Sequence, residues 1–158
     1  MIMNDKMRTI CSLHRNDNVS VPNELMNLLS AGLVSEGDCV FLRSLYSRRG
    51  NAVRESFPDE VGYECFVNHI HVDDYTTEVP LPVGLALVNE LGAIWAQQGM
   101  GGTLRVILSS DDIDCVLRCH LLRQDQSWLA DDIETYRNEA ILVADFEMKQ
   151  TSAGDACP

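Results

Sequence analysis

The chain has 158 residues, and its 12 lysines and arginines against 24 aspartates and glutamates give a net charge of −12. This length fits a single domain with a core that needs no disulfide to hold it, and 46% hydrophobic residues exclude wholesale disorder. The acidic balance argues against a protein that binds nucleic acid through its phosphates, because that requires clustered lysine and arginine.

The opening sequence MIMNDKMRTI lacks the apolar core of a signal peptide, and no segment reaches the roughly 20 apolar residues that cross a bilayer. None of the six cysteines forms a CxxC pair, which argues against a zinc ribbon or a thioredoxin-like site. We therefore expect buried free thiols in a cytoplasmic protein.

The first half of the chain alternates helical and extended patterns. Ser20 and Pro22 indicate the start of a helix, and residues 39–46 favour a strand followed by a polar loop. Residues 63–72, rich in aromatic and β-branched side chains, predict a second strand. The apolar face of the first helix is expected to contain Leu25, Leu28, Leu29 and Leu33.

Pro80 and Pro82 introduce a second helix, which ends at the glycines that begin with Gly99. Its apolar stripe is expected to contain Leu87, Val88, Leu91, Ile94 and Trp95.

The second half predicts a hairpin of residues 103–108 and 115–123, because apolar residues alternate with polar ones in the second segment. A short helix is expected to follow, since Leu129, Ile133 and Tyr136 share helical spacing. Residues 140–146 read as a central strand, apolar on both faces. We thus expect one α+β domain over residues 1–148, with about three helices on a mostly antiparallel sheet of four or five strands, and a flexible tail at 149–158.

The segment CFVNHIHVDDY contains the residue types of a metal site. On a strand, the side chains of Cys65, His69, His71 and Asp73 would point to one side. An HxH pair in this arrangement can bind a transition metal. With Glu78 it resembles part of a cupin-like ligand set, but the sequence has no second ligand-bearing motif. We therefore expect a polar or partner-facing strand and no metal, with a small metal-dependent enzyme as the alternative.

No catalytic motif of a known class is present, since GxSxG, GxxxxGK[ST] and HExxH are all missing. Neighbours on a strand point to opposite faces, so Cys119 and His120 cannot form a nucleophile–base pair. We expect neither enzymatic activity nor a cofactor.

Acidic residues are concentrated in residues 111–147, where ten acids face three arginines. They serve either as a solubilising surface or as a negative patch for a basic partner. Trp128 and Tyr136 lie next to them in sequence and fit an interface or a core equally well, while Asp73 and Asp74 offer a second acidic face. The expected patch contains Asp111, Asp112, Asp114, Asp131, Asp132 and Glu134.

The segment from LRVILSSDD to AILVADFE resembles the C-terminal part of small acidic immunity proteins of bacterial polymorphic-toxin systems, particularly contact-dependent growth inhibition. The resemblance rests on the LRCHLLR strand, Trp128, the DDIETY stretch and the AILVADF strand, about the last third of the chain.

This resemblance implies a cytoplasmic inhibitor that binds the toxic C-terminal domain of a cognate effector, one to one, and neutralises it. Many such toxins are nucleases with basic clefts, so we expect a basic nuclease partner and no direct contact with nucleic acid or membrane. An acidic adaptor domain with an unrelated basic partner would show the same charge pattern.

Overall fold

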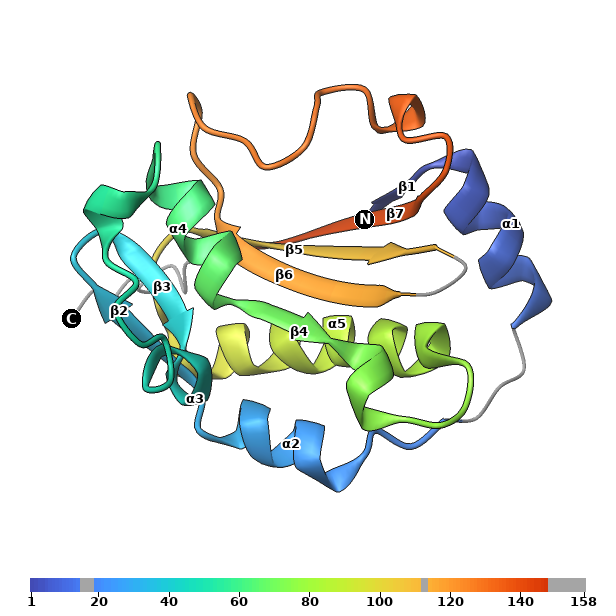
Figure 1. Ribbon diagram of the computed structural model, residues 1–158, viewed down its shortest axis with the longest axis horizontal. Coiled ribbons are helices and arrows are strands. Elements are labelled where there is room, and N and C mark those ends of the chain that lie inside the picture. The colour runs from blue at the N-terminus through green and yellow to red at the C-terminus, as the bar shows by residue number, and fades with distance from the viewer. Residues whose placement is uncertain (15–18, 112–113, 148–158) are drawn as a thin grey trace, which may run out of the picture.

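The computed structural model describes residues 1–14, 19–111 and 114–147. Its centre is an antiparallel five-stranded sheet in the order β1-β7-β5-β6-β4, with α5 below it and the 122–139 segment above it (Figure 1). The strands are β1 (Ile2–Met3), β4 (His69–His71), β5 (Thr103–Ser110), β6 (Cys115–Leu121) and β7 (Ala140–Glu147).

A smaller hairpin of β2 (Leu33–Glu36) and β3 (Cys39–Leu42) lies beside the main sheet. The expected α+β class is confirmed, and no helix of the described chain is long and apolar enough to cross a membrane. The α-helices are α1 (Asp5–Leu13), α2 (Asn23–Ser30), α3 (Arg43–Tyr46), α4 (Glu60–Val67) and α5 (Pro80–Gln98). Three short 3-10 helices are η1 (Arg54–Ser56), η2 (Val72–Tyr75) and η3 (Ile133–Thr135).

Helix α5 forms the main core with the lower face of the sheet, as its apolar stripe predicts. Leu87, Leu91 and Trp95 are fully buried, and Gly99 ends the helix with a φ of 65°. The helix approaches β7 so closely that a Cβ at Gly92 would lie 2.2 Å from a ring carbon of Phe146. Close packing of this kind fixes the helix against the sheet.

The upper face of the sheet is covered in part by the 122–139 segment. Ile107 and Val143 of the sheet pack there against Leu129, Ile133 and Tyr136. The expected helix through these three residues is wrong, since only the three-residue η3 forms. The prediction that 140–146 is a central strand is confirmed, because β7 lies between β1 and β5 with apolar side chains on both faces.

The expected strand over 63–72 is wrong for its first part, which forms α4. The side chain of Asp59 accepts a hydrogen bond from the Gly62 amide and caps that helix. Cys65 is therefore buried on a helix, away from the strand that contains the histidines. Two smaller corrections concern Leu33, which lies in β2, and residues 43–46, which form α3.

A buried polar network joins the small hairpin to the main sheet. Glu64 is fully buried and accepts hydrogen bonds from the Val40 amide at 2.7 Å and from Arg123 Nη1 at 2.5 Å. Asn68 accepts from the Leu42 amide and donates to backbone oxygens of both sheets. Burial raises the pKa of Glu64, so its hydrogen bonds are needed to keep the charged carboxylate inside the protein.

Candidate functional site

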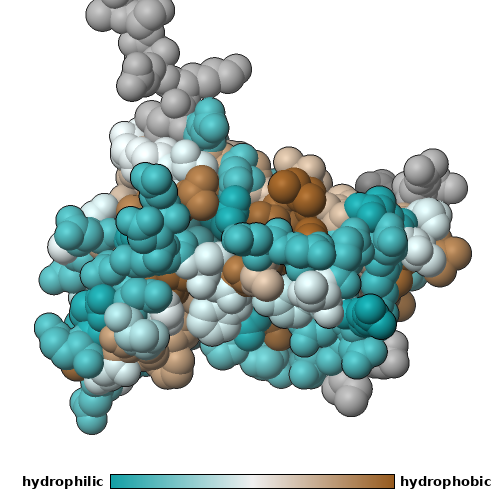
Figure 2. Space-filling view, turned by 90° about the horizontal axis from the view of Figure 1, so that it is seen from above, coloured by the Kyte–Doolittle hydropathy of each residue, from teal (hydrophilic) through white to brown (hydrophobic). Residues whose placement is uncertain are grey.

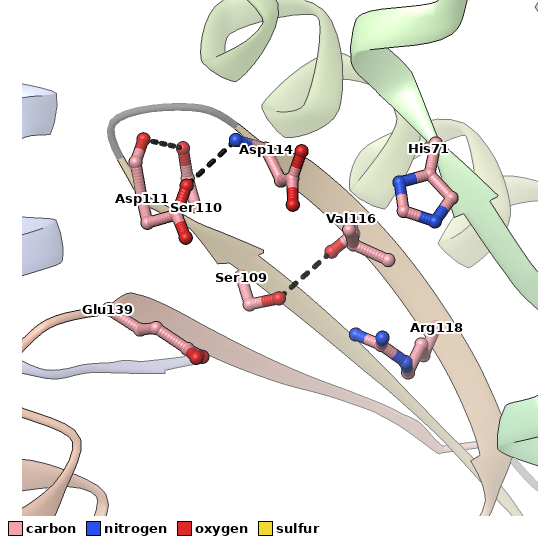
Figure 3. Close-up of a pocket in the computed structure, with 8 residues that line it drawn as sticks. All are labelled: His71, Ser109, Ser110, Asp111, Asp114, Val116, Arg118 and Glu139. Carbon is pink, nitrogen blue, oxygen red and sulfur yellow. Dashed lines mark hydrogen bonds between the residues drawn. The ribbon is translucent and has the colours of Figure 1, made fainter.

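An open polar pocket lies above the sheet where β5 ends and β6 begins. Its cavity measures about 180 Å³. The pairing of neighbouring strands brings its residues together. Val116 of β6 pairs with Ser109 of β5 and with His71 of β4, and Ser110 of β5 pairs with the first residue of β7. The residues that line the pocket are His71, Ser109, Ser110, Asp111, Asp114, Val116, Arg118 and Glu139 (Figure 3).

Arg118 is the cation of this pocket. Its side chain extends from β6 into the hollow (Figure 3), and burial lowers the pKa of its guanidinium. Within the described residues it has no hydrogen bond or ion pair, although its guanidinium carbon lies 5.5 Å from the centre of the Trp128 ring. A half-buried guanidinium without a partner is suited to bind a carboxylate or phosphate from outside.

Acidic side chains surround the pocket at the β5–β6 turn. Oδ1 of Asp111 accepts the Asp114 amide at 2.7 Å, so Asp111 helps to fold the turn. Asp114 and Glu139 are exposed and line the same hollow. The structure therefore brings together Asp111 and Asp114, as expected. It adds Glu139, which is the residue before β7.

His71 lines the pocket on the β4 side, and His69 and Asp73 lie close to it in the chain. Nε2 of His69 lies 3.0 Å from Nε2 of His71, and burial, Arg118 and His71 together lower the pKa of His69. Asp73 lies on η2 instead of the expected strand, and its Oδ1 accepts the Cys115 amide at 2.9 Å. His71, Asp73 and Asp114 each place one possible metal ligand within 4.8 Å of the others.

The cluster differs in composition from the metal-ligand set considered as the alternative from the sequence. Cys65 is not part of it, because α4 places that thiol elsewhere, and Glu78 lies outside the cluster. Asp114, the residue before β6, replaces them and lies more than forty residues later in the sequence.

The second group of expected acids, on the 122–139 segment, has a mainly structural role. Oδ1 of Asp132 caps η3 by accepting the Glu134 amide. The Glu134 carboxylate accepts the Asp5 amide and pairs with Arg8 at 2.8 Å. These contacts hold the 122–139 segment against α1.

The remaining expected residues are dispersed. Asp131 is exposed beside Arg105 in a second hollow, and Asp74 is exposed on η2. Trp128 is 41% exposed, and the Arg118 guanidinium carbon lies 5.5 Å from the centre of its ring, although Trp128 is not among the residues that line the pocket. Asp112 lies outside the described residues.

Sequence reasoning missed Ser109, Arg118 and Glu139 of the pocket, as well as Ser110 and Val116. The first two could have been found, because polar residues that alternate with apolar ones on a strand must share the face opposite the core. The place of Glu139 depends on the register of β5 against β7, which no local pattern specifies.

The sequence matches the Uncharacterized protein PM0498 family over residues 2–153. The chain belongs to this family. No curated protein and no solved structure matches it. Because the match spans the whole sheet, the pocket of this PM0498 protein lies within the part of the chain that places it in the family.

The face of the PM0498 protein seen from above the sheet is mostly hydrophilic, with a smaller apolar area within it (Figure 2). This is the side on which the 122–139 segment lies. Polar surface with an apolar centre is a common composition of protein–protein interfaces, and the face offers both acidic groups and the half-exposed Trp128.

Proposed function

We propose that this member of the PM0498 family is an immunity protein, which binds and neutralises the toxic domain of a contact-dependent inhibition effector. The observation that supports this is a set of exposed, unpaired carboxylates around an open pocket with an unpaired arginine in it. The expected partner is a basic nuclease domain, bound one to one in the cytoplasm, where the free thiols of the described cysteines are stable.

The charge of the pocket rim favours a basic partner. Within the described residues, the rim carboxylates Asp114 and Glu139 are exposed and take part in no ion pair. Exposed carboxylates add little to the stability of the fold. Their field accelerates the encounter with a basic surface and disfavours acidic partners.

Residues at the centre of the pocket can contribute strongly to the binding energy, which the exposed carboxylates of the rim do not. Arg118 lines the pocket with its guanidinium carbon 5.5 Å from the centre of the Trp128 ring, and arginine and tryptophan are enriched among the residues that dominate binding energy. A carboxylate of the partner that reaches Arg118 would lose water together with the guanidinium, which makes the contact strong and specific. An interface of ordinary size would cover roughly 800 Å² of each protein.

The test is a binding titration against the C-terminal domain encoded immediately upstream of the gene, at two salt concentrations, with the toxin's activity measured in parallel. Stoichiometric binding that abolishes the activity supports the proposal. Binding without neutralisation identifies an adaptor instead, and absence of binding overturns the proposal for that gene pair.

Charge-reversal variants test the face itself. The triple variant Asp74→Lys, Asp131→Lys and Glu139→Lys changes one carboxylate of the rim and two further predicted binding residues, whereas Glu24→Lys, Glu36→Lys and Glu55→Lys gives the same change of charge on exposed sites of other elements. We expect the first to slow association at low salt at least tenfold more than the second. Equal effects of the two triples would show that the rim is not the binding face.

A further inference from the structure

Three potential metal ligands converge at the edge of the pocket, independently of any protein partner. The ring of His71 and the carboxylates of Asp73 and Asp114 have ligand atoms within 4.8 Å of one another. They come from β4, from η2 and from the residue that precedes β6, and Figure 3 shows the side chains of His71 and Asp114 beside the same hollow.

The backbone holds this arrangement in place. His71 pairs with Val116 in the antiparallel ladder of β4 and β6, so the start of β6 lies beside the end of β4. Oδ1 of Asp73 accepts the amide of Cys115 at 2.9 Å, which fixes the carboxylate and leaves its second oxygen available. Ligands held by a second layer of hydrogen bonds are typical of metal sites in proteins.

The hydrogen bond between His69 and His71 bears on which ring nitrogen of His71 carries the proton. Only one proton fits between two Nε2 atoms 3.0 Å apart, so one ring donates and the other accepts. The tautomer in which His71 donates at Nε2 leaves its Nδ1 with a free lone pair.

In this tautomer the cluster consists of acceptors alone. Within the described residues no hydrogen bond joins His71 to Asp73 or Asp114, although each has a ligand atom within 4.8 Å of the other two. An imidazole lone pair and two carboxylates repel one another unless a cation lies between them. One ion at about 2.0–2.2 Å from each ligand fits this triangle after small side-chain rotations.

We propose that His71, Asp73 and Asp114 bind a divalent transition-metal ion, with His69 as the residue that orients His71. One imidazole and two carboxylates suit Zn²⁺, Mn²⁺ or Fe²⁺ better than Ca²⁺, which takes six to eight oxygens, or Cu⁺, which prefers sulfur. The free positions of the ion would face the pocket, on the side of Arg118.

The test uses the full chain with His14→Ala and Cys157→Ser, which removes another histidine and a thiol that could bind metal. ZnCl₂ is titrated by calorimetry, and CoCl₂ is added as a spectroscopic probe. We expect one site per chain and visible cobalt bands without thiolate-to-cobalt charge transfer. Charge-transfer bands or zero binding would overturn the proposal, since they show a cysteine site or none.

Variants assign the ligands. Asp114→Asn and His71→Ala should each weaken Zn²⁺ binding more than tenfold, and His69→Leu by about 10–100-fold, the usual effect of losing an outer-shell partner. Asp74→Asn is the matched control, because Asp74 is exposed and adjacent in sequence but outside the cluster. Unchanged affinity in Asp114→Asn, or an equal loss in Asp74→Asn, would contradict the assignment. Metal binding is read directly here, so a failure of the partner proposal leaves this result unaffected.

Discussion

His120 is a buried histidine whose titration should determine how stability depends on pH. It lies on β6 and is 1% exposed. Nδ1 lies 2.7 Å from the carbonyl oxygen of Leu121, to which it can donate, while Nε2 is buried without a partner among the described residues. Burial lowers the pKa of this histidine from 6.5 to about 4, so the folded protein keeps the ring neutral.

The size of the effect follows from linkage. Between pH 6.5 and 4 the unfolded chain binds a proton at His120 and the folded chain does not, so stability falls as the pH is lowered through this window. One pKa unit is worth about 1.4 kcal/mol, so the shift corresponds to roughly 3 kcal/mol in the free energy of unfolding. The stabilisation is fully present above pH 6.5 and is lost near pH 4.

Urea unfolding of the wild type and of His120→Asn at pH 7, 5.5 and 4 measures this. The asparagine amide can still donate to Leu121, and the carboxylates that also titrate are common to both proteins, so they cancel in the difference. We expect the wild type to lose roughly 3 kcal/mol more than the variant between pH 7 and pH 4. A difference that stays constant with pH, or a His120 NMR signal that titrates near 6.5, would refute the reasoning.

Two further predictions concern the packing of the fold. Gly92→Ala should destabilise the protein by about 1–3 kcal/mol in urea unfolding, because its Cβ overlaps the Phe146 ring; Phe146→Leu should restore part of the loss, and additive effects of the two changes would contradict the contact. Arg123→Met should cost about 3–5 kcal/mol at pH 7, because it leaves the buried Glu64 charge without its ion-pair partner. Its cost should decrease at pH 5 as Glu64 takes up a proton, and a cost independent of pH would show that Glu64 is not the cause.

Several elements could be predicted from the sequence because their signals are local. The helix that begins at Pro80 has a full apolar stripe and a glycine stop, and the second strand of the hairpin alternates apolar with polar residues from Leu117 to Leu121. Cys119 lies in the main core as expected, but His120 is buried too, so the expectation of a strand with a single buried face is wrong.

Other expectations failed where tertiary contacts outweigh local preference. Residues 60–67 have β-leaning side chains, yet the cap at Asp59 and the burial of Glu64 against Arg123 hold them in a helix. Leu129 and Tyr136 pack on the upper face of the sheet as their spacing indicates. They do so from an irregular segment of turns and bends that contains η3, because the face of the sheet buries these side chains without a longer helix.

The sequence by itself determined which chemical groups are present, namely an HxH pair, an excess of carboxylates and a few arginines. Only the tertiary structure decided which of them meet. Pairing of β4 with β6 brings His71 and Asp73 to Asp114, and pairing of β5 with β7 brings Glu139 to the same pocket. Strand register depends on the burial of whole faces and not on any one residue. A pocket whose residues come from three strands therefore cannot be predicted from local sequence patterns.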